Sequence, residues 1–118
     1  MARLSTHVLD TASGKPAAGL RLSLLSLDAA GNATLVSRHD TNRDGRTDAP
    51  LLSGASIATG RFRLSFEVGD YFRAAGVALP DPPFLDVVSV DFGIADAGGH
   101  YHVPLLVSPW SYSTYRGS

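Results

Sequence analysis

A strict two-residue alternation of apolar and polar side chains is the feature that most constrains the fold of this chain. In RFRLSFEV at 61–68, apolar residues occupy every second position and polar residues stand between them. Successive side chains of a strand point to opposite faces, so this segment predicts a strand with one face in the core. RLSLLSL at 21–27 alternates in the same way, with a phase change at Leu24–Leu25 that we interpret as a β-bulge.

Short apolar and β-branched runs predict the remaining strands. These runs are HVLD at 7–10, ATLVSR at 33–38, LDVVSVDF at 85–92, HYHVPLLV at 100–107 and WSYSTY at 110–115. One short helix is expected at YFRAA, 71–75, with Asp70 as its N-cap and Gly76 as the residue that ends it. Seven to eight short strands and one helix indicate an all-β fold, a two-sheet antiparallel β-sandwich.

Size and composition limit the classes of protein to which this chain can belong. Its 118 residues fit a single domain, 1–118, and the formal net charge of -1 offers no basic surplus for nucleic acid or an anionic membrane. The chain has no cysteine, which excludes disulfides and thiolate chemistry. No apolar run resembles a signal peptide or is long enough to span a bilayer, so a cytoplasmic location is expected.

Two of the four histidines are predicted to share one face of a strand. His100 and His102 have the same parity in the segment 100–107, whereas Tyr101 and Val103 face the other way. Histidine is the side chain best suited to proton transfer near neutral pH. Each histidine taken alone is nevertheless more often structural than catalytic.

The sequence offers possible ligands for two metal sites, but their spacing favours neither. His100-x-His102 with His7 would offer three imidazoles to a catalytic zinc ion, but an HxH pair is common by chance. DTNRDGRTD at 40–48 matches the first half of an EF-hand loop, yet Leu51 stands where the twelfth position needs a bidentate glutamate.

The loop 40–48 is better explained by turn chemistry. Asp44-Gly45 is typical of a tight turn, in which Asp40 and Asn42 would satisfy local backbone donors. Such a turn would hold Arg46 in a fixed position, and its planar guanidinium suits carbonyl or carboxylate oxygens.

Three blocks at both ends and in the middle of the chain carry a resemblance to a known family. They are LSTHVLDTASGKPAAGL at 4–20, TNRDGRTD at 41–48 and HYHVPLLVSPWSYSTYRGS at 100–118. Together they resemble the transthyretin-like 5-hydroxyisourate hydrolases. The terminal YRGS with His7 and His102 is the specific part, since transthyretin, the hormone carrier on the same fold, lacks that tail and those histidines. Trp110-Ser111 departs slightly from the family pattern, outside the matched catalytic positions.

The resemblance implies the hydrolysis of 5-hydroxyisourate to 2-oxo-4-hydroxy-4-carboxy-5-ureidoimidazoline in urate degradation. The catalytic residues that it implies are His7, Arg46, His102 and Ser118. The substrate-binding residues that it implies are His7, Arg46, Tyr115, Arg116, Gly117 and Ser118. Either His7 or His102 would activate water and Arg46 would stabilise the oxyanion, with no metal or other cofactor.

The resemblance also implies a homotetramer, a dimer of dimers with active sites at the dimer–dimer interface and a small purine-derived substrate. The residue pattern alone does not show this assembly. Two alternatives stay open at this point. One is a carrier that binds a small hydrophobic ligand in the channel between dimers, and the other is a structural β-sandwich that serves a larger enzyme.

Overall fold

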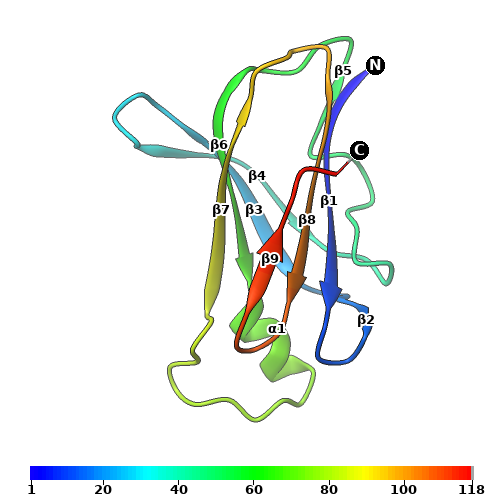
Figure 1. The fold of residues 1–118 in the computed structure, drawn as a ribbon, viewed down its shortest axis with the longest axis vertical. Helices are drawn as coiled ribbons and strands as arrows, with labels where there is room; N and C mark the ends of the chain where they lie inside the picture. Colours follow the sequence, from blue (N-terminus) through cyan, green and yellow to red (C-terminus); the bar gives the residue numbers. More distant parts are fainter. Residues whose placement is uncertain (118) are drawn as a thin grey trace.

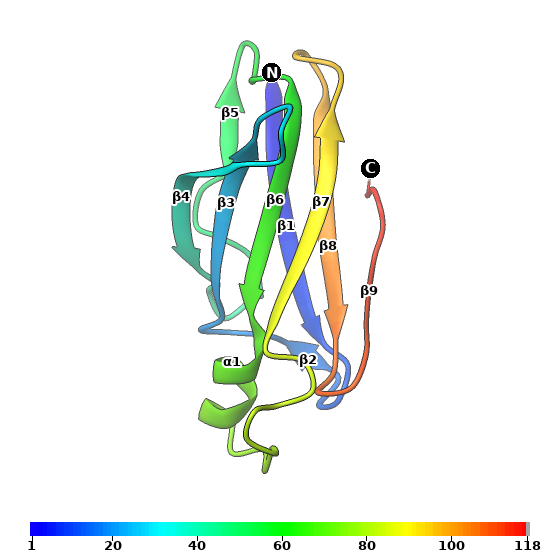
Figure 2. The ribbon, with the colours of Figure 1, turned by 90° about the vertical axis from the view of Figure 1, so that its left-hand side faces the viewer.

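Two β-sheets pack face to face in the computed structural model, which describes residues 1–117 (Figure 1, Figure 2). The elements are β1 (Ala2–Asp10), β2 (Lys15–Pro16), β3 (Arg21–Leu27), β4 (Ala33–Asp40), β5 (Leu52–Gly54), β6 (Gly60–Glu67), α1 (Val68–Ala74), β7 (Val87–Ile94), β8 (His100–Val107) and β9 (Tyr112–Thr114). One sheet has the order β2-β1-β8-β9, with β5 also paired to β1, and the other has the order β4-β3-β6-β7. The predicted all-β sandwich is confirmed.

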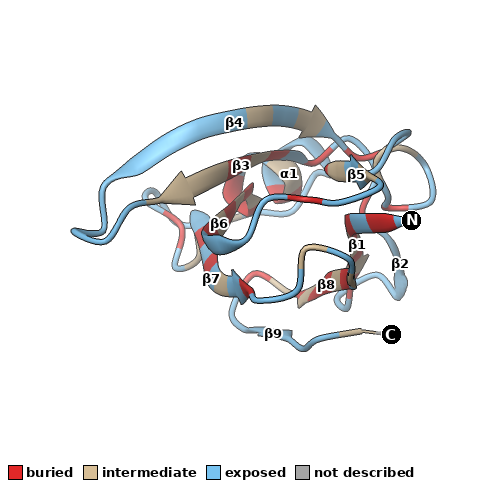
Figure 3. Ribbon diagram, turned by 90° about the horizontal axis from the view of Figure 1, so that it is seen from above, coloured by how far each residue is buried: buried red, intermediate tan, exposed pale blue. Residues whose placement is uncertain are grey.

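The alternation in the sequence is what separates the core from the surface. Phe62, Leu64 and Phe66 of β6 are buried, while the residues between them are partly exposed. Figure 3 shows buried residues interspersed along the inner strands, whereas β4 and β9 are mostly exposed or intermediate. Full burial of each such side chain is worth about 1.5–3 kcal/mol relative to exposure, so the core positions fix the strand register. The β3–β4 register shifts between Leu24 and Leu25, where the bulge was predicted, but the extra residue is Val36 of β4.

The first sheet differs from the expectation in two respects. Two short strands, β2 and β5, were not predicted, because two or three residues are too few to show a period of two. In addition, β1 and β8 run parallel, whereas the other strand pairs are antiparallel. Their register places Ser5 opposite His102 and His7 opposite Pro104. This parallel pair therefore joins the first and third sequence blocks side by side.

The helix begins three residues earlier than predicted, ends one residue earlier, and is capped differently. It begins at Val68 directly after β6, with Glu67 at the N-cap position and no side-chain cap hydrogen bond. Asp70 lies in the first turn, so its prediction as N-cap was wrong; burial of Val68 and Phe72 sets the start instead. Gly76 follows the helix with φ +85°, as expected for its end. No helix within residues 1–117 has the length and apolar character needed to cross a membrane.

A buried carboxylate ties the helix to the end of β1. The Asp10 side chain is 4% exposed, and its Oδ2 accepts a hydrogen bond of 2.9 Å from the Tyr71 hydroxyl. Its Oδ1 accepts hydrogen bonds from the backbone N–H groups of Ala12 and Ser13. Burial, followed by the hydrogen bond to Asp10 and its negative charge, raises the pKa of Tyr71 to about 12. Tyr71 therefore stays protonated and holds α1 against the first sheet.

Candidate active site

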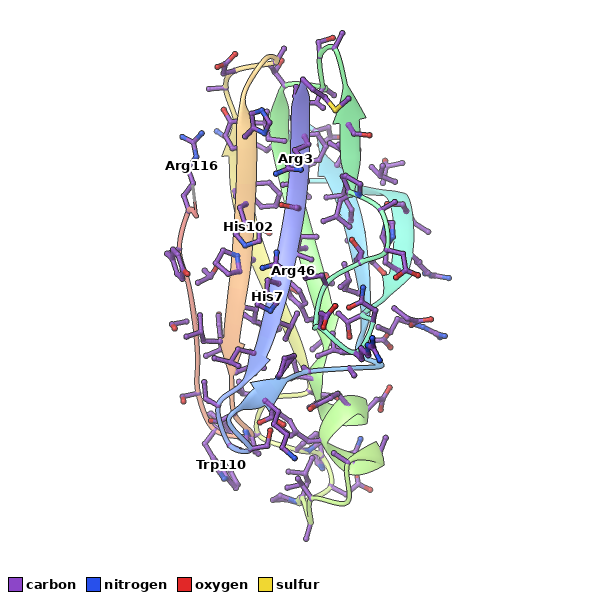
Figure 4. All side chains as sticks on the ribbon, turned by 90° about the vertical axis from the view of Figure 1, so that its right-hand side faces the viewer. Arg3, His7, Arg46, His102, Trp110 and Arg116 are labelled. Carbon is purple, nitrogen blue, oxygen red and sulfur yellow. The ribbon has the colours of Figure 1, made fainter. Side chains whose placement is uncertain are left out.

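The outer face of the first sheet carries a row of polar side chains from two neighbouring strands. Ser5 and His7 of β1 and His102 of β8 alternate with buried residues and so point away from the core. Figure 4 shows His7, Arg46 and His102 close together on this side of the sheet, with Arg3 further along β1. The predicted separation of His100 and His102 from Tyr101 and Val103 is confirmed.

Arg46 reaches this face because its loop is docked on β1. The Asn42 side-chain oxygen accepts hydrogen bonds from the backbone N–H groups of Asp44 and Arg46, as the turn prediction required. Gly45 has φ +76°, and its carbonyl oxygen accepts a hydrogen bond of 2.8 Å from the Val8 N–H. A Cβ at Gly45 would collide with the Val8 carbonyl oxygen, so only glycine fits here.

Asp40 does not take part in this turn, and that part of the prediction was wrong. Its Oδ1 accepts a hydrogen bond of 3.3 Å from Nε of Arg21, an exposed ion pair across β3 and β4. Asp40 is the last residue of β4, so its side chain belongs to the strand pair and not to the loop. The position of Arg46 is set by contacts of Asn42 and Gly45, and Asp40 does not contribute to them.

His102 is half-buried and held by its neighbour on β1. Its Nδ1 lies 2.9 Å from the Ser5 hydroxyl oxygen. Burial lowers the pKa of His102 below its ordinary value of 6.5, and the positive charges of Arg46, His7 and Arg3 lower it further. The imidazole is therefore mainly neutral at pH 7. Within residues 1–117, no hydrogen-bond partner is present for Nε2.

A pocket of about 270 Å³ opens beside this histidine. Its lining residues are Arg3, Ser5, Arg46, His100, Tyr101 and His102. A smaller pocket of about 180 Å³ shares Arg3, Ser5 and Arg46 with it and continues along residues 47–50. Neither Arg3 nor Arg46 forms a salt bridge to an acidic group within residues 1–117. Two guanidinium groups and a neutral imidazole suit a small molecule rich in oxygen atoms.

A larger depression lies elsewhere but lacks such chemistry. It has a volume of about 400 Å³ on the second sheet and contains no histidine. Its Arg63 is already paired with Asp91 at 2.6 Å. We therefore place the candidate active site at His102.

The C-terminal residues approach the site in two ways. Gly117 forms an antiparallel bridge to His102, and its N–H donates to the His102 carbonyl oxygen at 2.7 Å. The Arg116 guanidinium instead lies over the Tyr101 ring, 4.3 Å from the centroid. Tyr115 and Arg116 line a cleft of about 260 Å³ beside β7, not the histidine pocket. Ser118, predicted as a catalytic and binding residue, lies outside the described residues.

Two residues of the pocket were missed by sequence reasoning. Arg3 and Ser5 precede His7 by four and two positions, so they share its strand parity. Extending the first predicted strand towards the N-terminus would have found both. The predicted strand began at His7, whereas β1 begins at Ala2.

No three histidine, cysteine or acidic side chains in the described part of the chain lie close enough together to hold a metal ion. The three imidazoles of the zinc alternative, His7, His100 and His102, are thus not gathered into a ligand set within one chain. The acidic side chains of the loop 40–48 do not form such a group either.

Comparison with known proteins gives a consistent result. The model of the HIUase/Transthyretin family matches residues 4–117. The 5-hydroxyisourate hydrolase of Ralstonia nicotianae is 59% identical over 118 residues, which cover 100% of both chains. A crystal structure of (S)-allantoin synthase has a TM-score of 0.91 and 45% identity; the match covers 99% of this chain but 44% of that one. Sea bream transthyretin in complex with thyroxine has a TM-score of 0.85 and 28% identity, covering 98% of this chain and 94% of that one.

Proposed function

Because this chain belongs to the HIUase/transthyretin family, we propose that it hydrolyses 5-hydroxyisourate, a step of urate degradation, at the pocket beside His102. The reaction opens a ring amide with water and gives 2-oxo-4-hydroxy-4-carboxy-5-ureidoimidazoline. The observation that carries the proposal is the contact of His102 with Ser5 on a wall that also holds Arg46. Hydrolysis of an amide requires a base, an oxyanion partner and a proton donor. The pocket wall offers His102 and Arg46 for two of these roles, and His7 lies close to both on β1 (Figure 4).

His102 is assigned as the base that activates water. A general base must be unprotonated at the working pH, and the lowered pKa of His102 meets that condition. If Nδ1 carries the proton and donates it to Ser5 Oγ, the lone pair on Nε2 can accept a proton from water. His7, on the neighbouring strand, is assigned to protonate the departing nitrogen. The water oxygen then bonds to the amide carbon, and the C–N bond breaks.

Arg46 is assigned to the oxyanion. Its guanidinium presents several N–H donors in one plane and keeps its charge at any relevant pH. Docking of Gly45 on β1 fixes the backbone from which this side chain extends, so few internal motions are lost on binding. The loss of one such donor typically costs two to three orders of magnitude in rate.

The terminal residues Tyr115 to Ser118 are assigned to the wall of the pocket in the assembled protein. Gly117 already contacts His102 within one chain, which supports a role for this segment at the site. Tyr115 is 60% exposed and Arg116 is directed to Tyr101, so their substrate contacts would require an adjustment or a neighbouring subunit. The catalytic and binding roles of Ser118 remain predictions.

A homotetramer with active sites between dimers is part of the proposal. Within residues 1–117, β7 and β9 pair on one side only, and an edge of this kind can pair with another strand. Nearby, the rings of Phe84 and Trp110 lie 6.0 Å apart and are 69% and 59% exposed. Large apolar side chains that lie together and are exposed favour contact with another subunit. The cytoplasmic location and the single domain, 1–118, likewise stay predictions.

A carrier function is the alternative, because the sea bream transthyretin structure holds thyroxine. The lining of the pocket weighs against it: two arginines, two histidines and a serine suit a polar purine derivative better than an apolar hormone. To test the proposal, 5-hydroxyisourate is generated in situ from urate and its ultraviolet absorbance followed with and without the protein. Decay faster than the spontaneous rate, unaffected by a chelator, is expected. Decay at the spontaneous rate would refute the proposal.

A further inference from the structure

We infer that Gly117 is a positioning residue for His102. The site requires glycine at position 117 because glycine has no side chain. The inference rests on the proposed function, since it assumes that His102 does the chemistry. It goes beyond the assignment of the terminal residues to substrate binding, because Gly117 would act through the imidazole and not on the substrate.

The backbone of Gly117 passes directly along the edge of the His102 ring. A Cβ placed on Gly117 would lie 2.6 Å from Cδ2 of His102 and 3.2 Å from both its Cβ and Cγ. A Cβ atom essentially never approaches a non-bonded carbon as closely as 2.6 Å, so either the ring or the tail would have to move. Glycine is the residue type that allows this approach.

The ring is held from its other side as well. Ser5 Oγ contacts Nδ1 at 2.9 Å, and Ser5 is opposite His102 in the β1–β8 pair. A displacement of the imidazole away from Gly117 would therefore disturb the Ser5 contact. The two neighbours together define one orientation of the ring, and hence the direction of Nε2.

Three residues of the tail, Thr114, Arg116 and Gly117, form contacts with β8 that resist displacement of the tail. Gly117 N–H donates to the His102 carbonyl oxygen at 2.7 Å. Arg116 Nη2 donates to the His100 carbonyl oxygen at 3.3 Å, and the guanidinium lies over the Tyr101 ring. The Thr114 hydroxyl donates to the Pro104 carbonyl oxygen at 2.7 Å. These contacts bind the segment to β8 along its length, so the imidazole is the part that a methyl group at position 117 would move.

The test compares Gly117→Ala with Gly93→Ala. Gly93 lies in β7, and a Cβ there would meet nothing within 4 Å, so Gly93→Ala controls for adding one methyl group to a glycine in this protein. Gly117→Ala is expected to lower kcat by a factor of about 10–100 with little change in KM, since a misplacement of 1 Å can cost about 10²-fold. Gly93→Ala should retain the wild-type kcat and KM.

A second readout does not depend on activity. The His102 ring is followed by NMR as a function of pH in wild type, Gly117→Ala, Ser5→Ala and the double variant. If the methyl group pushes the ring off Ser5, both single variants should change the His102 titration, and their effects should not add in the double variant. An unchanged His102 titration in Gly117→Ala, or effects that add, would overturn the inference.

The two proposals fail in different ways. If wild-type protein does not hydrolyse 5-hydroxyisourate, the proposed function is wrong while the NMR comparison still decides the role of Gly117. If Gly117→Ala reduces the stability of the fold, NMR spectra of its folded fraction at low temperature still show whether the His102 titration has changed. An active Gly117→Ala variant with wild-type kcat would refute the positioning role even if hydrolysis by the wild type is confirmed.

Discussion

Ser5 and His102 stand opposite each other on two parallel strands, with Oγ of Ser5 2.9 Å from Nδ1 of His102. The two residues are 97 positions apart in the sequence. Their contact depends on the β1–β8 pair, which also brings His7 to the same face. It fixes one imidazole nitrogen and leaves the other for chemistry, and the predictions about His102 depend on it.

Replacement of His102 by Asn should lower kcat by about two or more orders of magnitude, because general acid–base catalysis contributes that much. His39→Asn is the matched control: His39 lies on β4 of the other sheet and contacts Ser37. It should retain wild-type kinetics in the absorbance assay. Full activity of His102→Asn would show that another group is the base.

Removal of the positive charge at Arg46 should raise the pKa of His102. Burial is the main cause that lowers this pKa, and the charge of Arg46 is the next. In Arg46→Met, the NMR titration midpoint of His102 should therefore move upward from its wild-type value, while hydrolysis falls through loss of the oxyanion partner. An unchanged or lower midpoint would mean that Arg46 does not face the imidazole.

Deletion of Tyr115–Ser118 should abolish hydrolysis and leave the fold largely intact. Core side chains are contributed by β1, β3, β6, α1, β7, β8 and a few loop residues, whereas residues 110–116 are exposed. Circular dichroism and thermal unfolding should show a folded β protein, and the absorbance assay should show only spontaneous decay. Wild-type turnover by the folded, truncated protein would contradict the assignment of this segment to the site.

Tyr71→Phe should lower the free energy of unfolding at pH 7 by about 1 kcal/mol, the net value of one hydrogen bond. The ordinary pKa of tyrosine is 10.0, and that of Tyr71 is raised to about 12. The contribution of Tyr71 is therefore complete below pH 10 and is lost as the pH rises towards 12. Denaturant titrations should show wild type approaching the variant over this range. A constant difference in stability up to pH 12 would contradict it.

Phe84→Glu should shift the protein to smaller assemblies. The substitution places a charge in the exposed Phe84–Trp110 pair, where we propose that a subunit docks. Sedimentation velocity should show a tetramer for wild type and a smaller species for the variant. Val77→Glu is the control, since Val77 is exposed in the loop after α1 and is not part of this aromatic pair. A monomeric wild type would refute the proposed assembly.

Features set by neighbouring residues were predictable from the sequence. The alternation at 61–68, the register shift at Leu24–Leu25 and the turn at Asp44-Gly45 each depend on a few consecutive positions. The shared face of His100 and His102 follows from strand parity alone. Features of this kind are governed mainly by residues close together in the sequence.

Features set by distant partners were not predictable in the same way. The parallel β1–β8 pair, the Asp40–Arg21 ion pair and the Tyr71–Asp10 hydrogen bond each join segments separated in the chain. Asp70 had the residue type of an N-cap, but burial of Val68 determined where the helix begins. The alternating pattern of the sequence could place Gly117 near the end of a strand. It could not show that Gly117 contacts the His102 ring.

The most direct test compares the pH dependence of hydrolysis with the titration of one side chain. The rate of 5-hydroxyisourate loss above the spontaneous rate is measured across pH, and the His102 ring is titrated by NMR in the same buffers. The account predicts an enzymatic rate that falls towards acid, with a midpoint below 6.5 that coincides with the His102 midpoint. No acceleration at any pH, or an acidic midpoint unrelated to that of His102, would contradict it.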